Sequence, residues 1–104
     1  MSDPITVMIV DDHEMVRHGA SGYLEAQLDI EVVAEAESGE EAVRLAREHV
    51  PHVVLMDLVM PGMDGVEATR KVKDVSPRSL IIVLTSYHQD EHIFPALQAG
   101  AISY

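Results

Sequence analysis

Three short runs of apolar and β-branched residues stop abruptly at polar side chains. The runs, with the side chains that end them, are 5–10 before Asp11 and Asp12, 53–56 before Asp57, and 80–84 before Thr85 and Ser86. Because the runs are continuous and do not alternate with polar residues, they predict strands buried on both faces, as in a parallel sheet. A looser run over residues 30–36 predicts one more strand.

Helical spacing fills the intervals between these runs. A first helix is predicted by apolar or small residues that recur three and four positions apart, at Met15, Val16, Gly19, Ala20, Tyr23 and Leu24. Two capping boxes open the next helices, Ser38 with Glu41 and Asp64 with Glu67. Within the first of these helices, Glu40 is placed to support Arg44 one turn further on.

The last helical pattern, over residues 90–100, contains Pro95. Proline inside a helix removes a hydrogen bond and clashes with the preceding turn, at a cost of about 3 kcal/mol. We therefore expect the regular helix to start near Phe94 and Pro95, with residues 89–93 irregular. Residues 101–104 predict the beginning of a fifth strand.

Strand and helix patterns alternate along the whole chain, which predicts an α/β fold with a doubly wound parallel sheet and helices on both of its faces. In a parallel sheet the carboxyl ends of the strands share one edge. The polar side chains that end the three apolar runs should therefore converge there, although they are far apart in the sequence, and ligands of open α/β sheets bind at this edge.

The length, charge and residue composition of the chain argue against several classes of function. The chain has 104 residues, enough for one domain, and 18 acidic against 7 basic side chains give a formal net charge of −11. Such a charge argues against direct binding of nucleic acid and favours cations or basic partner surfaces. The chain has no cysteine, no apolar stretch long enough to span a membrane and no secretory signal, which fits a cytoplasmic protein.

The three predicted neighbours Asp11, Asp12 and Asp57 would repel one another. At an effective dielectric constant of 20, two charges ~4 Å apart cost about 4 kcal/mol. Oxygen ligands alone, with no histidine placed among the three acids, favour Mg²⁺, with Mn²⁺ as a substitute. Such a site can bind a phosphoryl group, with Asp57 as the nucleophile that forms an acyl phosphate. We expect Thr85 to donate a hydrogen bond to it, while the small Ser86 leaves its backbone approachable.

Taken together, these motifs resemble the receiver domain of two-component response regulators over the whole chain. The resemblance rests on the Asp11–Asp12 pair, on Asp57 with residues 60–65 behind it, and on Thr85–Ser86. The stretch 11–14 with Arg17 and Gly19 is similar to the subgroup that carries a helix-turn-helix output domain. The resemblance implies a flavodoxin-like fold with strand order 2-1-3-4-5.

The resemblance also implies roles for individual residues. Asp12 and Asp57 would bind Mg²⁺ directly together with the main-chain carbonyl of Val59, and Asp11 would act mainly through water. Thr85 and Tyr104 match the switch positions that reorient after phosphorylation. The phosphoryl donor would be a phosphohistidine of a sensor histidine kinase. The domain would not be an enzyme, beyond catalysing its own phosphorylation and dephosphorylation, and it would contact DNA only through an output domain that regulates transcription.

One feature departs from the family pattern, because no lysine follows Lys73, whereas the family has one shortly after the switch aromatic. We therefore expect residues 1–104 to form a C-terminally incomplete receiver domain, truncated in strand five and without the last helix. Such a chain should self-associate through the open strand edge. The missing lysine also keeps one alternative open, a non-phosphorylated pseudo-receiver that acts as a protein-interaction module.

Two other classes fit less well. A flavodoxin-type mononucleotide binder needs a phosphate loop after the first strand, where residues 11–14 place negative charge instead. A phosphatase of the haloacid-dehalogenase type needs a second acid two residues after its nucleophile, where this chain has Val59.

Overall fold

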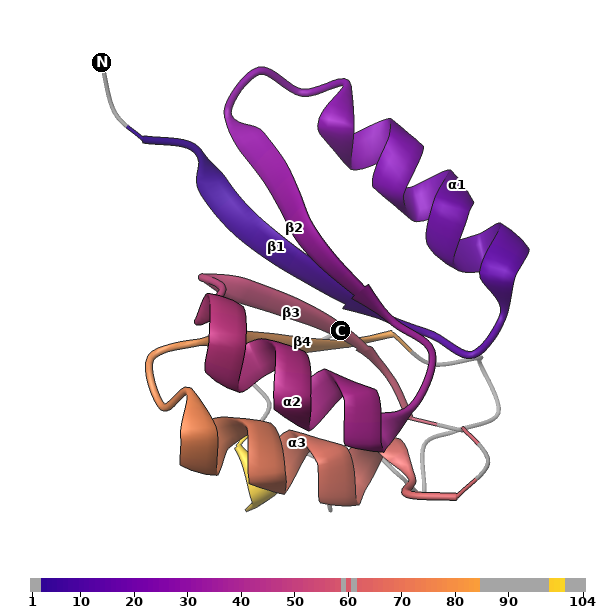
Figure 1. Ribbon diagram of the computed structural model, residues 1–104, viewed down its shortest axis with the longest axis vertical. Coiled ribbons are helices and arrows are strands. Elements are labelled where there is room, and N and C mark those ends of the chain that lie inside the picture. Colours follow the sequence, from indigo (N-terminus) through magenta and orange to yellow (C-terminus); the bar gives the residue numbers. More distant parts are fainter. Residues whose placement is uncertain (1–2, 59, 61, 85–97, 101–104) are drawn as a thin grey trace.

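The computed structural model describes residues 3–58, 60, 62–84 and 98–100. Its elements alternate as the sequence predicts: β1 (Ile5–Val10), α1 (Glu14–Glu25), β2 (Ile30–Ala36), α2 (Gly39–His49), β3 (Val53–Asp57), α3 (Gly65–Val75) and β4 (Leu80–Leu84). The four strands form one parallel sheet in the order β2-β1-β3-β4 (Figure 1), which confirms the flavodoxin-like arrangement for these strands. The predicted fifth strand and the helix containing Pro95 lie largely outside the described residues.

The predicted caps begin both helices on one side of the sheet. The Ser38 hydroxyl accepts a 3.1 Å hydrogen bond from the amide of Glu41 and so caps α2. Asp64 Oδ1 accepts a 2.9 Å hydrogen bond from the amide of Glu67 and caps α3. These bonds satisfy amides that would have no partner within the helix.

One predicted pair on α2 is wrong. Arg44 pairs with Glu41, one turn earlier at 3.5 Å, and Glu40 forms no ion pair with it. The other Glu41 carboxylate oxygen accepts a hydrogen bond from the amide of Glu37. A single glutamate therefore accepts from the amide that precedes the Ser38 cap and also supports the arginine, which follows three residues later on the same helix face.

The main hydrophobic core lies between the sheet and the α2–α3 layer, on the side of α2 and α3 in Figure 1. Its fully buried side chains include Met8 of β1, Met56 of β3 and Ile81 of β4. Leu58 and Met60 extend this core past the end of β3. Burial therefore holds Leu58 and Met60 in place shortly after Asp57.

Among the described elements, α1 alone covers the opposite side of the sheet. It packs there against β1 and β2 (Figure 1), and Leu80 and Leu84 of β4 are 48% and 46% exposed. On α1 itself, Met15 is 88% and Tyr23 72% exposed, and Arg17 is buried instead. The expectation of strands buried on both faces is therefore confirmed for residues 7–10 of β1 and wrong for Leu80 and Leu84 of β4. The expectation of one buried apolar face on α1 is wrong.

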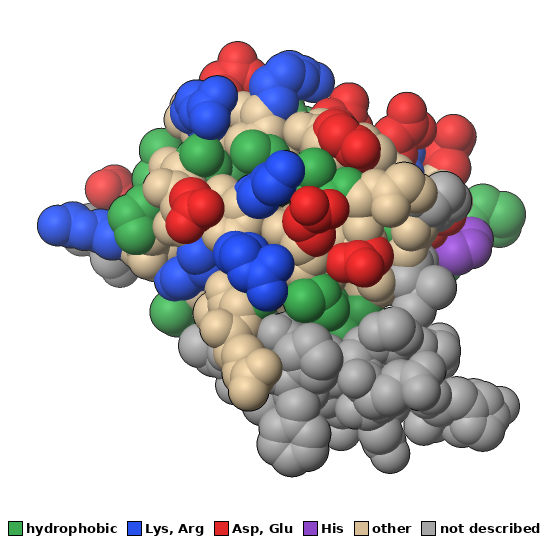
Figure 2. Space-filling model, turned by 90° about the horizontal axis from the view of Figure 1, so that it is seen from below, with side chains coloured by type: hydrophobic (Ala, Val, Ile, Leu, Met, Phe, Trp, Pro, Cys, Tyr) green, Lys and Arg blue, Asp and Glu red, His purple; other side chains and the backbone are tan. Residues whose placement is uncertain are grey.

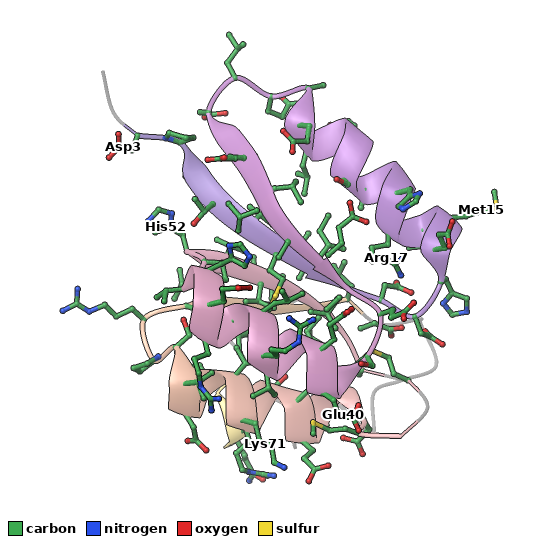
Figure 3. All side chains as sticks on the ribbon, in the orientation of Figure 1. Asp3, Met15, Arg17, Glu40, His52 and Lys71 are labelled. Carbon is green, nitrogen blue, oxygen red and sulfur yellow. The ribbon has the colours of Figure 1, made fainter. Side chains whose placement is uncertain are left out.

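The positive charge of the chain is unevenly placed. Six of the seven Lys and Arg side chains lie between positions 44 and 78, on α2, on α3 and in the turn that follows. Figure 2 shows Lys and Arg side chains gathered among Asp and Glu on the face that α2 and α3 cover. Only Arg17 lies elsewhere, and it lies beside the acidic edge of the sheet (Figure 3).

Candidate functional site

The register of the sheet brings the predicted acids together. Val10 of β1 pairs with Met56 of β3, so that Asp11 and Asp57 both follow at the same level of the sheet. Asp12 comes next, before α1 begins at Glu14. The apolar register thus positions the carboxylates, as expected for adjacent parallel strands whose carboxyl ends share an edge.

Four side chains form a compact cluster at this edge. Asp11, Asp12, His13 and Asp57 each offer one potential ligand atom, and these atoms all lie within 4.8 Å of one another. The three acids are half-buried and His13 is exposed. The predicted convergence of the three carboxylates is therefore confirmed.

His13 lies directly beside the acids and is exposed. Its amide donates a 2.8 Å hydrogen bond to Asp11 Oδ1, and its ring Nδ1 lies 3.0 Å from the same oxygen and 3.2 Å from Asp12 Oδ1. The hydrogen bond to Asp11, then the negative charges of Asp12, Asp11 and Asp57, raise the pKa of His13 above 6.5. The expectation that no histidine lies among the acids is therefore wrong.

The donor set suits a hard divalent cation. Asp12 Oδ1 is buried and accepts no hydrogen bond within the described residues, and it lies 3.2 Å from His13 Nδ1. A buried carboxylate oxygen without a hydrogen bond is costly unless a cation neutralises it. Clustered carboxylate oxygens are the ligands that Mg²⁺ and Mn²⁺ prefer, so the residues fit a divalent cation.

The segment behind Asp57 is packed closely against the start of α3. The amide of Gly65 donates a 3.0 Å hydrogen bond to the carbonyl of Leu58. A Cβ at position 65 would lie 2.4 Å from both the Asp57 main-chain oxygen and the Leu58 Cα. Only glycine allows this approach, which holds the backbone that carries Asp57.

Sequence reasoning missed Arg17 as part of this edge. Its guanidinium Nη1 donates a 2.8 Å hydrogen bond to the main-chain carbonyl of Asp11, and its Nε lies 3.3 Å from Glu35 Oε1 of β2. One feature of the sequence could have indicated this position. Arg17 is a basic residue within the predicted apolar helix pattern, and no other Lys or Arg precedes Arg44. The remaining predicted site residues, Val59, Thr85, Ser86 and Tyr104, lie outside the described residues.

Fold, strand order and acidic edge define a class of protein. The family model of the response regulator receiver domain matches residues 7–104, and the chain belongs to this family. It is therefore a signalling domain and not an enzyme. Receiver domains work with a cognate histidine kinase, and the acidic cluster is typical of their Mg²⁺ site.

The similar proteins include regulators of transcription. The chain is 55% identical over 100 residues to the transcriptional regulatory protein LiaR of Bacillus subtilis (strain 168). The matched region covers 96% of this chain and 47% of LiaR. It is 52% identical over 100 residues to the response regulator protein VraR of Staphylococcus aureus (strain NCTC 8325 / PS 47), with coverages of 96% and 48%. The chain spans about half the length of the curated relatives it matches.

Solved structures agree with the fold. A two-component response regulator of the LuxR family from Aurantimonas sp. SI85-9A1 superposes with a TM-score of 0.89 at 38% identity, covering 98% of this chain and 73% of that chain. The response regulator domain of Thermotoga maritima CheB gives a TM-score of 0.89 at 31% identity, with coverages of 96% and 75%. Within the described residues, no helix has the length and apolar content needed to cross a membrane.

Proposed function

We propose that Asp57 accepts a phosphoryl group from a phosphohistidine of the cognate sensor histidine kinase. The observation that carries the proposal is the close cluster of Asp11, Asp12 and Asp57 at the carboxyl edge of the sheet. In a structural role, three carboxylates would not be gathered here, because their mutual repulsion destabilises the folded chain.

The proposed transfer is a displacement at phosphorus. A carboxylate oxygen of Asp57 attacks the phosphorus atom, so that the O–P bond of an acyl phosphate forms while the N–P bond of the donor breaks. The electron pair of the broken bond stays on the donor imidazole, which then takes a proton from solvent. The family membership and the position of Asp57 at the end of β3 support this assignment.

Asp12 and Asp57 would hold Mg²⁺, or Mn²⁺ in its place, together with the main-chain carbonyl of Val59, and Asp11 would act mainly through water. When bound, the ion neutralises the charges of the acids and of the phosphoryl group. We assign Thr85 to donate a hydrogen bond to the acyl phosphate, Ser86 to leave its backbone accessible to it, and Thr85 with Tyr104 to the switch.

The coupled output of the domain is also a proposal. The relatives LiaR and VraR are about twice as long as this chain, and LiaR is a transcriptional regulatory protein. We infer that residues 1–104 act in the cytoplasm as the receiver part of such a regulator, and that DNA is contacted by an output domain and not by this strongly acidic chain. Self-association through β4, the outer strand of the described sheet, is supported by the exposure of Leu80 and Leu84.

Incorporation of phosphate from acetyl phosphate tests the central assignment. The wild-type chain should take up one phosphoryl group in the presence of Mg²⁺ and none after chelation, and Asp57→Asn should take up none. Asp74 is an exposed acid on α3, far from this edge of the sheet in the sequence. Asp74→Asn therefore removes one negative charge, as Asp57→Asn does, and this variant should take up phosphate as the wild type does. Labelling of Asp57→Asn would show that the nucleophile is assigned wrongly.

The alternative is a pseudo-receiver that binds partners without phosphorylation. It predicts that neither acetyl phosphate nor a kinase labels the chain under any metal condition, while the fold stays intact. The retention of all three acids favours the phosphorylated domain over this alternative.

A further inference from the structure

Arg17 is the only charged side chain that is buried among the residues the structure describes, with 8% of its surface exposed. It lies in the first turns of α1 and reaches toward the carboxyl ends of β1 and β2 (Figure 3). Burying a guanidinium costs free energy that an apolar side chain would not cost, so the interactions it makes must offset that cost. Two interactions are present, and both involve the edge of the sheet.

The first contact fixes a peptide group between two site residues. Arg17 Nη1 donates a 2.8 Å hydrogen bond to the main-chain oxygen of Asp11, which belongs to the peptide joining Asp11 to Asp12. The preceding peptide group is also held, because the amide of Asp11 donates a 3.0 Å hydrogen bond to the carbonyl of Ala36. The orientation of this peptide decides where the carboxylates of Asp11 and Asp12 point, because both side chains branch from its ends.

The second contact holds the guanidinium itself. Arg17 Nε lies 3.3 Å from Glu35 Oε1, and the Glu35 side chain is 29% exposed, which limits screening by water. His18 Nε2 approaches the same oxygen at 3.8 Å. The guanidinium thus donates one hydrogen bond, to the Asp11 carbonyl, and is paired with Glu35 through charge alone, since Glu35 Oε1 accepts no hydrogen bond within the described residues. Arginine suits this place because its charge is spread over a planar group with several donors, whereas the ammonium of a lysine acts as a single point charge.

We propose that Arg17, held by Glu35, is a positioning residue that orients the Asp11–Asp12 peptide and thereby prepares the carboxylates for the divalent cation. The inference rests on the proposed function of the acidic cluster. Partners that orient metal ligands typically change metal affinity by about 10–100-fold when they are removed. Arg17 would act through the peptide bond and would not itself contact the ion.

Charge and geometry have opposite effects here. The positive charge of Arg17 alone weakens the binding of a cation, while its hydrogen bond to Asp11 strengthens binding by orienting the ligands. Removing Arg17 alone would mix the two effects. The double variant Arg17→Gln/Glu35→Gln removes one positive and one negative charge together, so that a change in metal affinity reports the lost orientation.

The matched control is Glu67→Gln/Lys71→Gln, which removes an exposed ion pair on α3 (Nζ to Oε2, 3.8 Å) and keeps the net charge. The probe is Mn²⁺ alone, titrated by calorimetry. We expect the Arg17/Glu35 double variant to bind Mn²⁺ about tenfold more weakly, at the lower end of the range for such partners. The control should stay within about twofold of the wild type, since exposed pairs contribute little.

A second readout needs no metal. The His13 amide donates to Asp11 Oδ1, so its hydrogen exchange reports the orientation of the Asp11 side chain. In the metal-free double variant this amide should exchange faster than in the wild type and the control. Arg17→Lys, which preserves the charge and one donor, covers the case in which the double variant does not fold. It should bind Mn²⁺ with intermediate affinity and also expose the His13 amide.

Unchanged Mn²⁺ affinity and unchanged His13 exchange in a folded double variant would overturn the positioning role and leave the proposed function intact. Full wild-type behaviour of Arg17→Lys would overturn the part assigned to Glu35, because a single donor to the Asp11 carbonyl would then suffice. A wild-type chain that takes up no Mn²⁺, yet whose His13 exchange still depends on Arg17, would contradict the proposed function and support the positioning role.

Discussion

A Cβ at Gly65 would lie 2.4 Å from the main-chain oxygen of Asp57. Gly65→Ala must therefore push α3 away from the segment that carries the proposed phosphoryl acceptor. We expect the free energy of unfolding to fall by about 2 kcal/mol, as is typical for overpacking, and labelling of Asp57 to slow. Urea unfolding and the rate of labelling by acetyl phosphate measure the two effects.

Gly22→Ala is the matched control for this prediction, because a Cβ at this exposed position of α1 meets nothing within 4 Å. In a helix, alanine is favoured over glycine by about 0.8–1 kcal/mol, so this variant should be more stable than the wild type. If both variants gained stability, the close packing of α3 against the end of β3 would be wrong.

Val50 ends α2 in the left-handed region, with φ = 45°, and is a β-branched residue in a conformation that favours glycine. Its side chain is exposed, so little burial is lost on truncation. Val50→Gly should stabilise the chain by roughly 0.5–1 kcal/mol, since the relief of strain exceeds the entropy cost of glycine. Val50→Ala keeps the strain and should bring no comparable gain in thermal or urea unfolding.

Metal binding should stabilise the folded chain through the acidic cluster. Mg²⁺ at ten times its dissociation constant adds about 1.4 kcal/mol to the free energy of unfolding by mass action. Asp12→Asn should lose this response, and without metal it should be more stable than the wild type because one repulsive charge is removed. Asp74→Asn should respond to Mg²⁺ as the wild type does. An equal response of all three chains in thermal melts would place the metal elsewhere.

The pKa of His13 gives a dependence on pH in the metal-free chain. Because the folded-state pKa is raised above 6.5, the imidazolium stabilises the fold fully below pH 6.5, and this contribution is lost as the pH rises through the folded pKa. The stability advantage of the wild type over His13→Gln should therefore be larger at pH 6 than at pH 8. Titration of His13 by NMR should show its pKa lowered in Asp11→Asn, and an unchanged pKa would contradict the hydrogen bond.

The sequence predicted the sheet and the convergence of Asp11, Asp12 and Asp57 because continuous apolar runs specify buried parallel strands and their carboxyl ends share an edge. It predicted the caps because Ser38 and Asp64 act on amides only three residues away. These features depend on local chemistry or on topology alone.

Features that depend on side-chain direction and on neighbouring elements were not predictable in this way. Periodicity in α1 showed an apolar face, but not that Met15 and Tyr23 would be exposed while Arg17 turned inward. The position of His13 depends on the turn that connects β1 to α1, whose geometry no periodic pattern encodes. The pairing of Arg44 with Glu41 depends on rotamers among two available glutamates.

The position of the phosphoryl group on the chain decides whether Asp57 is the acceptor. After reaction with acetyl phosphate and Mg²⁺, borohydride reduces an aspartyl phosphate to homoserine, which peptide mass spectrometry assigns to one position. We expect homoserine at position 57 of the wild-type chain, none after chelation of the metal, and the same result for Asp74→Asn. Homoserine at another acid, or none at any position in a folded, Mg²⁺-saturated chain, would contradict Asp57 as the phosphoryl acceptor.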